Sequence, residues 1–462
     1  MSSRRKNGIF RMLRWGGIAV AVLVVLGYVA ARLAATRWEA DVERELAAIE
    51  ASGAPLRPED LVKDASSAPA WWTGLSASPF RLFDLDLDDL ESIRARLEGP
   101  DESFAPIERG LLERLAALHE EGVADDLLLG GLTDTLPVFG ADPRWTPAHV
   151  TYTRVRAAVS GDLIAAAPSA CDGPGFDARS WIDAWLASDA PVPTPDAMSG
   201  PIETQKALAR RAWLAALDGD ERTALESLRL GTCTARAYEE APGQTHALAW
   251  CLQNDLLIRS LVLVAQVLPE TDLAEFEPLL FELDTRERLR RALEEERAIG
   301  YAAFSRPGDA VERSPGAWLN PLQWLGAPLQ ASYDRAVYFE TYSRLIAAAR
   351  GPSVEAREEV RAVLEDLDEK IFALRSQLLV APASGLVRVA YHLEARATLA
   401  RAVLVARSDG LDAARAWILT QIDPFSGDPY RVEIDAGGAL RASSIWSWDA
   451  EKDALSVVLE SR

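Results

Sequence analysis

The stretch LAALDGDERTALESL, residues 214–228, sets the expectation for the fold of this chain. Apolar residues recur with helical spacing on both sides of Asp218-Gly219-Asp220, and Asp and Gly are residues that favour tight turns. The stretch therefore predicts a helix, a short turn and a second helix. The stretch ARSDGLDAARAWI, residues 406–418, repeats the pattern around Asp409.

The longest amphipathic stripe lies between Val354 and Val380. Its apolar positions are spaced four, three, four, three and four residues apart: Val360, Leu364, Leu367, Ile371, Leu374 and Leu378. This spacing puts them on one face and predicts one amphipathic helix packed on a helical core. Because the body exceeds the roughly 250–300 residues at which a single core stops growing, we expect two lobes or a curved stack of hairpins.

The chain changes character after a turn cluster at residues 423–429. The segments YRVEI, ALRASSIWSW and LSVVLES alternate apolar and polar residues and are rich in β-branched and aromatic side chains. They predict a small antiparallel meander that packs on the body. Trp446 and Trp448 share one face of a predicted strand, so they are our candidate interaction patch.

The predicted fold is mainly α. Stacked antiparallel helical hairpins, in two lobes or a short solenoid, follow an N-terminal transmembrane helix, and a small C-terminal antiparallel β-meander ends the chain. The expected segments are a cytoplasmic basic tail (1–14), a transmembrane anchor (15–35), an N-terminal helical lobe (36–190), a C-terminal helical lobe (200–422) and the meander tail (423–462). A proline-rich seam, residues 187–201, separates the lobes, and no sustained 34-residue repeat is found.

The N-terminus predicts a membrane anchor. Residues 1–37 hold seven basic and no acidic side chains, and WGGIAVAVLVVLGYVAA (15–31) is uncharged. If Arg32 extends toward the headgroups, the span reaches Ala35, and at about 1.5 Å per residue it is about 31 Å long. Trp15 and Tyr28 lie where interfacial aromatic residues belong. The alternatives are a cleaved signal peptide, with Val29-Ala30-Ala31 as its cleavage site, and a buried core helix.

Charge sets the expected topology and excludes one class of partner. Positive residues stay inside, so we expect a single-pass signal-anchor in the cytoplasmic (inner) membrane, with the N-terminus in the cytoplasm and the body in the periplasm or outside. The net charge is -21, and the basic start leaves -28 for the other 425 residues. A body this acidic argues against nucleic acid as a partner. Five lysines among 49 basic residues suggest a GC-rich, bacterial genome.

Three cysteines leave two interpretations. Cys233 and Cys251 lie nine residues on either side of Pro242, in the break expected between two antiparallel helices. In an oxidising envelope they are a candidate disulfide, which would leave Cys171 over. The alternative is that both are small buried hydrophobic residues.

The sequence offers no recognisable catalytic chemistry. The four histidines share no metal-ligand spacing, and neither a Gly-x-Ser-x-Gly elbow nor a phosphate-binding Gly-x-x-x-x-Gly-Lys loop occurs. We therefore predict no catalytic residue, no metal and no cofactor.

Short motifs resemble a group of bacterial proteins. DPFSGDPYR (423–431) and IWSWDAEKD (445–453) resemble the closing segment of uncharacterised single-span, membrane-anchored helical proteins, and LRLG, LIRSLVLVA and RRALEEERAIG are similar to their central helices. Only the tail resembles that of type II secretion pseudopilins, because the GFTLIE-like processing motif is missing. The run at 449–453 replaces the group's usual Gly-Asp-Gly. The resemblance implies an anchored helical architecture and no known activity.

These observations favour a membrane-tethered extracytoplasmic helical protein that presents a protein-interaction surface, without catalysis. Its expected partners are the lipid bilayer, through residues 15–35, and an envelope protein whose identity the sequence does not give. The alternatives are an envelope hydrolase that uses paired carboxylates and an accessory component of a secretion system.

Overall fold

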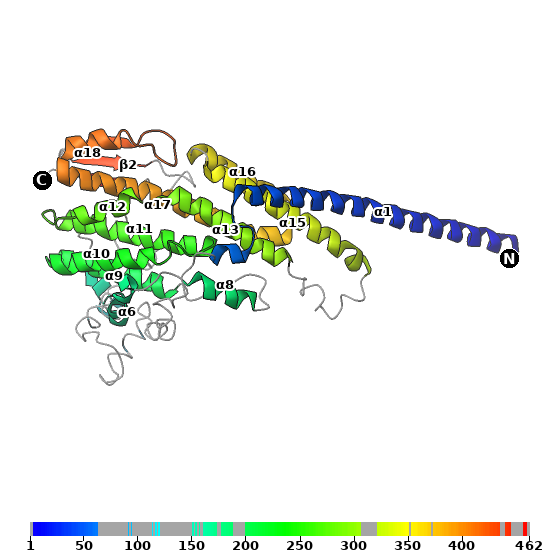
Figure 1. Ribbon diagram of the computed structural model, residues 1–462, viewed down its shortest axis with the longest axis horizontal. Coiled ribbons are helices and arrows are strands. Elements are labelled where there is room, and N and C mark those ends of the chain that lie inside the picture. The colour runs from blue at the N-terminus through cyan, green and yellow to red at the C-terminus, as the bar shows by residue number, and fades with distance from the viewer. Residues whose placement is uncertain are drawn as a thin grey trace.

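The computed structural model describes residues 3–62, 160–172, 177–187, 199–305, 321–350, 353–370, 373–434, 439–444 and 456–459, with scattered positions from 91 to 157. This part of the chain is mainly helical and ends in a small antiparallel sheet, as predicted. Most helices lie along the long axis of the molecule, and α1 projects from one end of it (Figure 1).

The elements occur in the following order. They are α1 (Ser3–Ser52), η1 (Pro58–Val62), α6 (Gly161–Ala166), α7 (Ser169–Asp172), α8 (Ala178–Leu186), α9 (Ser199–Leu217), α10 (Glu221–Arg236), α11 (Gln244–Val267), η5 (Ala274–Phe276), α12 (Glu277–Phe281), α13 (Thr285–Ser305), α15 (Pro321–Arg350), α16 (Ser353–Glu369), α17 (Leu374–Asp409), α18 (Leu411–Ile418), β1 (Arg431–Ile434), β2 (Leu440–Ser443) and β3 (Ser456–Leu459).

The hairpin predicted at residues 214–228 is confirmed. Helix α9 ends at Leu217 and α10 begins at Glu221. Gly219 adopts a left-handed φ of 75°, and the carboxylate of Asp220 accepts the Thr223 amide at 3.0 Å, which caps α10. The second predicted turn is also present, because α17 ends at Asp409 and α18 begins at Leu411.

Helix α11 is the central element of the core. It packs against α9, α10, α13 and α17. Among the residues whose side chains are described, α11 is the helix long and apolar enough to cross a membrane, and 89% of its most apolar window is buried inside the body. We therefore describe α11 as the core helix of the body.

The stripe predicted as one helix from Val354 to Val380 is divided between two helices. Helix α16 ends at Glu369 and α17 begins at Leu374. A long-range contact accounts for the break: the buried Asp334 of α15 accepts the amide of Ser376, in the first turn of α17, at 2.9 Å. On α16 the stripe behaves as predicted, since Val360 and Leu367 are buried.

The predicted C-terminal meander is confirmed. The strands are ordered β1-β2-β3 and both pairs are antiparallel, with Ala442 of β2 opposite Val432 and Val457. Leu440 and Ala442 point to the buried face of β2, and the sheet packs on α17 and α18. The small sheet therefore closes the end of the body that is opposite to the projecting α1 (Figure 1).

Three short helices come from the segment predicted as an N-terminal lobe. Helix α6 packs on α9, α7 on α10, and α8 on η1. The end of α1, which belongs to the same predicted segment, contributes Val42 and Ile49 to the main core cluster of the body.

Candidate functional site

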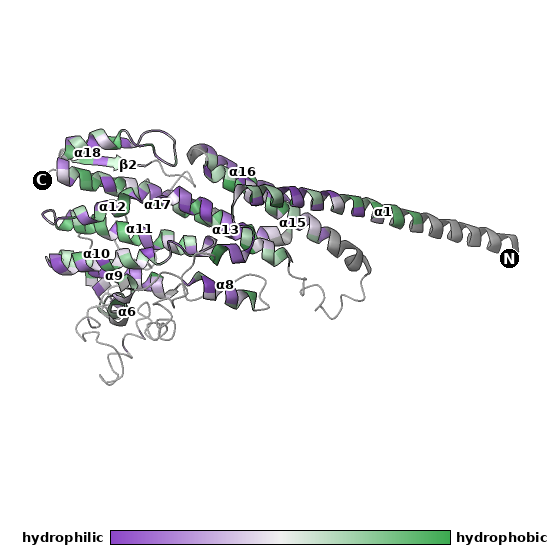
Figure 2. Ribbon diagram, viewed as in Figure 1, coloured by the Kyte–Doolittle hydropathy of each residue, from purple (hydrophilic) through white to green (hydrophobic). Residues whose placement is uncertain are grey.

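Helix α1 changes character near Ala35. From Val25 to Ala30 every side chain is exposed, so apolar residues face outward all round the helix, and Leu26 and Leu33 are 59% and 63% exposed. Beyond that point the buried residues are Ala35, Val42 and Ile49, at seven-residue intervals on one face. Figure 2 shows hydrophobic residues along α1 where it leaves the body.

The second half of α1 packs on α15. The rings of Trp38 and Tyr333 meet edge to face with centroids 5.0 Å apart. The Ser332 hydroxyl donates to Glu39 at 3.1 Å, and further along the Ser343 hydroxyl donates to Glu45 at 2.8 Å. One continuous helix therefore joins the exposed apolar stretch to the core, with no flexible linker between them.

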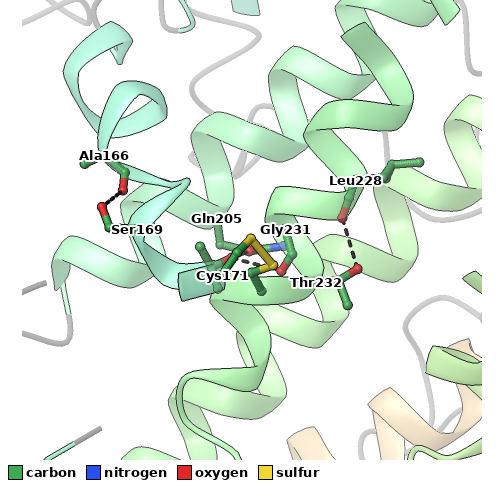
Figure 3. The surroundings of a disulfide bond; sticks show 9 residues. Ala166, Ser169, Cys171, Gln205, Leu228, Gly231 and Thr232 are labelled. Atoms are coloured by element: carbon green, nitrogen blue, oxygen red, sulfur yellow. Dashed lines mark hydrogen bonds between the residues drawn. A yellow bond between two sulfur atoms is a disulfide. The ribbon is translucent and has the colours of Figure 1, made fainter. Parts of the chain in front are cut away.

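A disulfide joins Cys171 of α7 to Cys233 of α10 (Figure 3). The predicted Cys233–Cys251 pair is therefore wrong, and Cys251 is a buried free thiol. The connection between α10 and α11 is not centred on Pro242. Cys233 lies three residues before the end of α10 and Cys251 seven residues inside α11, so the two do not lie at the same height. Burial raises the pKa of Cys251 to about 12.

A buried polar centre lies where α13 meets the start of α11. Helix α11 has Gly243 at its N-cap and no capping side chain. Two neighbouring glutamates of α13 take this role: Glu295 accepts the Gly243 amide at 2.8 Å and Glu296 accepts the Gln244 amide at 3.1 Å. The guanidinium of Arg288 donates to Glu295 at 3.4 Å and to the Ala241 carbonyl. The buried carboxylate of Glu295 and the half-buried carboxylate of Glu296 therefore satisfy the first amides of the core helix.

Burial dominates the ionisation of this polar centre. It raises the pKa of Glu296 to about 7, and the negative charge of Glu295 raises it further, while the Gln244 amide acts in the opposite direction. Burial also raises the pKa of Glu295, and Arg288 counteracts this effect. Burial lowers the pKa of His246 to about 4, so its ring is neutral at pH 7, and Nδ1 lies 2.6 Å from the Pro242 carbonyl oxygen.

The sequence prediction missed this polar centre. The available signal was the run of three glutamates, residues 294–296, directly after the apolar pair Ala292-Leu293. Three successive residues cover more than half of the helix circumference, so at least one of them must face the core.

A pocket of about 180 Å³ opens beside the polar centre, between the ends of α10 and α12 and the first turns of α13. Its apolar wall is formed by Trp250, Leu279 and Leu283. Its remaining lining is charged or polar: Arg236, Glu239, Asn254, Glu282, Asp284, Glu287, Arg288 and Arg291.

Two acids and one arginine of this pocket already have local partners. Asp284 caps α13 by accepting the Glu287 amide at 2.9 Å, and the Glu287 carboxylate pairs with Arg290. Arg291 pairs with Glu240 at 3.2 Å. Part of the charged lining of the pocket is therefore already neutralised by neighbouring side chains.

The motif DPFSGDPYR closes the tail. Asp423 accepts the Phe425 amide at 3.0 Å and the hydroxyl of Ser444, after β2, at 2.8 Å. Gly427 has a left-handed φ of 74° and donates its amide to the Asp423 carbonyl at 2.9 Å. Phe425 is buried and its ring lies 5.4 Å from that of His392. The residues that carry the resemblance thus stabilise a turn at the end of the body.

The other predicted positions give little chemistry. The candidate patch residues Trp446 and Trp448 lie outside the described residues. In the part of the chain that the structure describes, no group of His, Cys, Asp and Glu side chains could hold a metal ion.

No family model, curated protein or solved structure matches this chain.

Proposed function

We propose that this chain is a single-pass inner-membrane protein whose residues 15–35 cross the bilayer and whose helical body lies outside the cytoplasm. The observation that carries this proposal is the change along α1, from side chains exposed all round at residues 25–30 to a single buried face from Ala35 onward.

The energetics favour lipid around the first half of α1. Val25, Leu26, Val29 and Leu33 are each between 47% and 63% exposed. Burying one fully exposed side chain of this kind is worth about 1.5–3 kcal/mol, and because these four are already about half covered, their remaining exposed surface represents roughly 3–7 kcal/mol that water would not supply. A bilayer supplies it, because acyl chains surround a helix on every side.

The disulfide supports the proposed location of the body. Disulfides persist in oxidising compartments such as the bacterial periplasm and are rare in the cytosol. The bond between Cys171 and Cys233 belongs to the body, and the basic residues lie before the apolar stretch. Both features favour the same orientation, with the N-terminus in the cytoplasm.

The proposed role of the body is to present a surface to an envelope protein. The tight turn at Gly219 joins α9 to α10, and α11 packs on both helices, which supports an arrangement of stacked antiparallel hairpins. The charged pocket beside Trp250 is the concave feature of this surface that we propose as the contact site. The bilayer and the rigid α1 would fix the distance of this pocket from the membrane.

Labelling of intact cells tests the orientation. A cysteine introduced by Glu221→Cys, at an exposed position of the body, should react with a membrane-impermeant maleimide, and one introduced by Lys6→Cys should react only after permeabilisation. An N-terminal epitope tag should stay with the full-length chain. The opposite labelling pattern would refute the orientation, and loss of the tag would show a cleaved signal peptide.

Site-specific crosslinking tests the partner. A photo-crosslinking residue at the exposed Glu239, beside the pocket, should give one defined protein adduct in intact cells. The same residue at Glu340, which is exposed on α15, is the matched control. Equal crosslinking at both positions would contradict a contact at the pocket.

A further inference from the structure

The beginning of α15 is a second uncharged segment. PLQWLGAPLQASY, residues 321–333, contains no Asp, Glu, Lys, Arg or His, and the first charged residues of the helix are Asp334 and Arg335. The segment also holds Gly326 and Pro328 inside a helix, and both residue types are more frequent in transmembrane helices than in soluble ones.

The contacts between α1 and α15 fix the relative height of the two helices. The contacting pairs are Ser332 with Glu39, Tyr333 with Trp38, and Ser343 with Glu45. Their residue numbers differ by 293, 295 and 298, a nearly constant offset, so the helices run in the same direction. Both helices begin toward the N-terminal end of the molecule and run away from it into the body, and α15 begins part-way along α1 (Figure 1).

The same offset places the start of α15 within the proposed span. Pro321 lies level with residues 23–28 of α1, inside the range 15–35. Asp334 lies level with residues 36–41 of α1, where Arg37 and Glu39 follow Arg32, the one charged residue inside the proposed span. Apart from Arg32, whose guanidinium donates to the Tyr28 hydroxyl at 3.1 Å, the charged residues of the two helices on the body side of the span therefore begin at one common height.

We propose that residues 321–333 of α15 lie in the outer leaflet of the bilayer beside α1, with the Trp38–Tyr333 pair at the level of the headgroups. This inference rests on the proposed function, in which α1 spans the membrane. Tryptophan and tyrosine are enriched at the membrane–water interface, and this pair lies where both helices become charged. The body would then contact lipid through two elements instead of one.

The backbone of this segment suits a non-polar environment. A helix satisfies its own amides and carbonyls except in the terminal turns, and Pro321 has no amide hydrogen to leave unsatisfied at the first position. From Pro321 to Tyr333 the helix rises about 18 Å, roughly the thickness of one leaflet with its headgroups. The segment is therefore long enough to enter one leaflet and too short to cross the bilayer.

Depth-dependent fluorescence quenching on the full-length protein in lipid nanodiscs tests the proposal. Single cysteines introduced by Leu26→Cys, Ala327→Cys and Glu340→Cys are labelled with an environment-sensitive dye. Quenching by nitroxide lipids is then compared with quenching by aqueous iodide. Native Cys251 does not interfere at pH 7, because it is buried and its pKa is raised to about 12. Ala331→Cys, an exposed position nearer the body, gives a second measurement at headgroup level.

The expected result is that the dyes at positions 26 and 327 are both quenched by lipid nitroxides, several-fold more than the dye at position 340. The dye at 331 should respond to headgroup nitroxides. If position 26 is quenched by lipid but 327 responds to iodide like 340, the anchor stands and the inference is overturned, which would leave this face of α15 for a protein partner. If position 26 is itself accessible to iodide, the proposed function fails together with the inference.

Discussion

Removing the disulfide should lower the unfolding free energy of the body, and the size of the loss depends on the length of chain that the disulfide closes into a loop. Cys171 and Cys233 are 62 residues apart in the sequence. In the chain-entropy description, a cross-link over such a loop removes about 14 cal/mol/K of entropy from the unfolded chain, or about 4 kcal/mol at 25 °C. The double variant Cys171→Ala/Cys233→Ala should therefore lose about 2–4 kcal/mol of unfolding free energy, the typical measured range.

Denaturant unfolding of the detergent-solubilised protein, followed by circular dichroism with and without a reductant, measures this loss. The oxidised wild-type protein should lose stability on reduction, and the double variant should not respond. Cys251→Ala is the matched control, because its thiol is buried and unpaired, so this variant must retain the response to reductant. A double variant as stable as the oxidised wild type, or one still sensitive to reductant, would refute the reasoning.

The loss should also be uneven along the chain. Helix α7, which carries Cys171, has four residues and packs on α10. The core helix α11 is instead buried along most of its length. Hydrogen exchange in the double variant should therefore accelerate first at residues 161–172 and last in α11. Equal acceleration in both segments would show that the bond stabilises only the whole body.

Three further predictions concern single residues. Glu296 has a pKa of about 7 in the folded state against 4.5 in the unfolded state, so the protonated form stabilises the fold at low pH. The unfolding free energy of the wild-type protein should therefore fall by about 3 kcal/mol at most as the pH rises from about 4.5 to 7. In Glu296→Gln most of this pH dependence should be absent when unfolding is measured across the same pH range. Gly300→Ala should lower the unfolding free energy by several kcal/mol in thermal unfolding, because a Cβ at this position would overlap the ring of Tyr338. Gly385→Ala is the control: the space around Gly385 is open, so this variant should be neutral or stabilising by up to about 1 kcal/mol. Asp423→Ala should cost about 2 kcal/mol and expose the tail to limited proteolysis, since two buried donors lose their acceptor; unchanged proteolysis would contradict the proposed role of the turn.

Features that depend on neighbouring residues were predictable from the sequence. The Asp-Gly-Asp turn at residues 218–220 works through a left-handed glycine and a capping carboxylate within four residues of each other. The meander followed from the alternation of residues 430–461 for the same reason. In both cases the determining contacts are local or repeat with a fixed period.

Features that depend on distant partners were not predictable in this way. The break between α16 and α17 depends on Asp334, which belongs to α15 and caps Ser376 across 42 residues. The disulfide partner of Cys233 lies 62 residues earlier, so symmetry about a nearby turn identified the wrong cysteine. The polar centre likewise needs α13 to meet the start of α11, 52 residues before it, and no spacing rule gives that contact.

The uneven charge of the chain fits the geometry of its first helix. The body carries -28 and would be repelled by an anionic membrane surface, over a range of about 10 Å at ordinary salt. If a flexible linker joined the body to the anchor, the distance between the body and the bilayer would vary with the strength of this repulsion. Helix α1 instead continues from the apolar stretch into the core, where Val42 and Ile49 are buried, so in the proposed orientation packing would fix the distance. If the start of α15 also enters the outer leaflet, two helices oppose the repulsion and restrict rotation of the body about α1. Each surface of the body, the charged pocket included, would then keep a constant height and direction relative to the membrane.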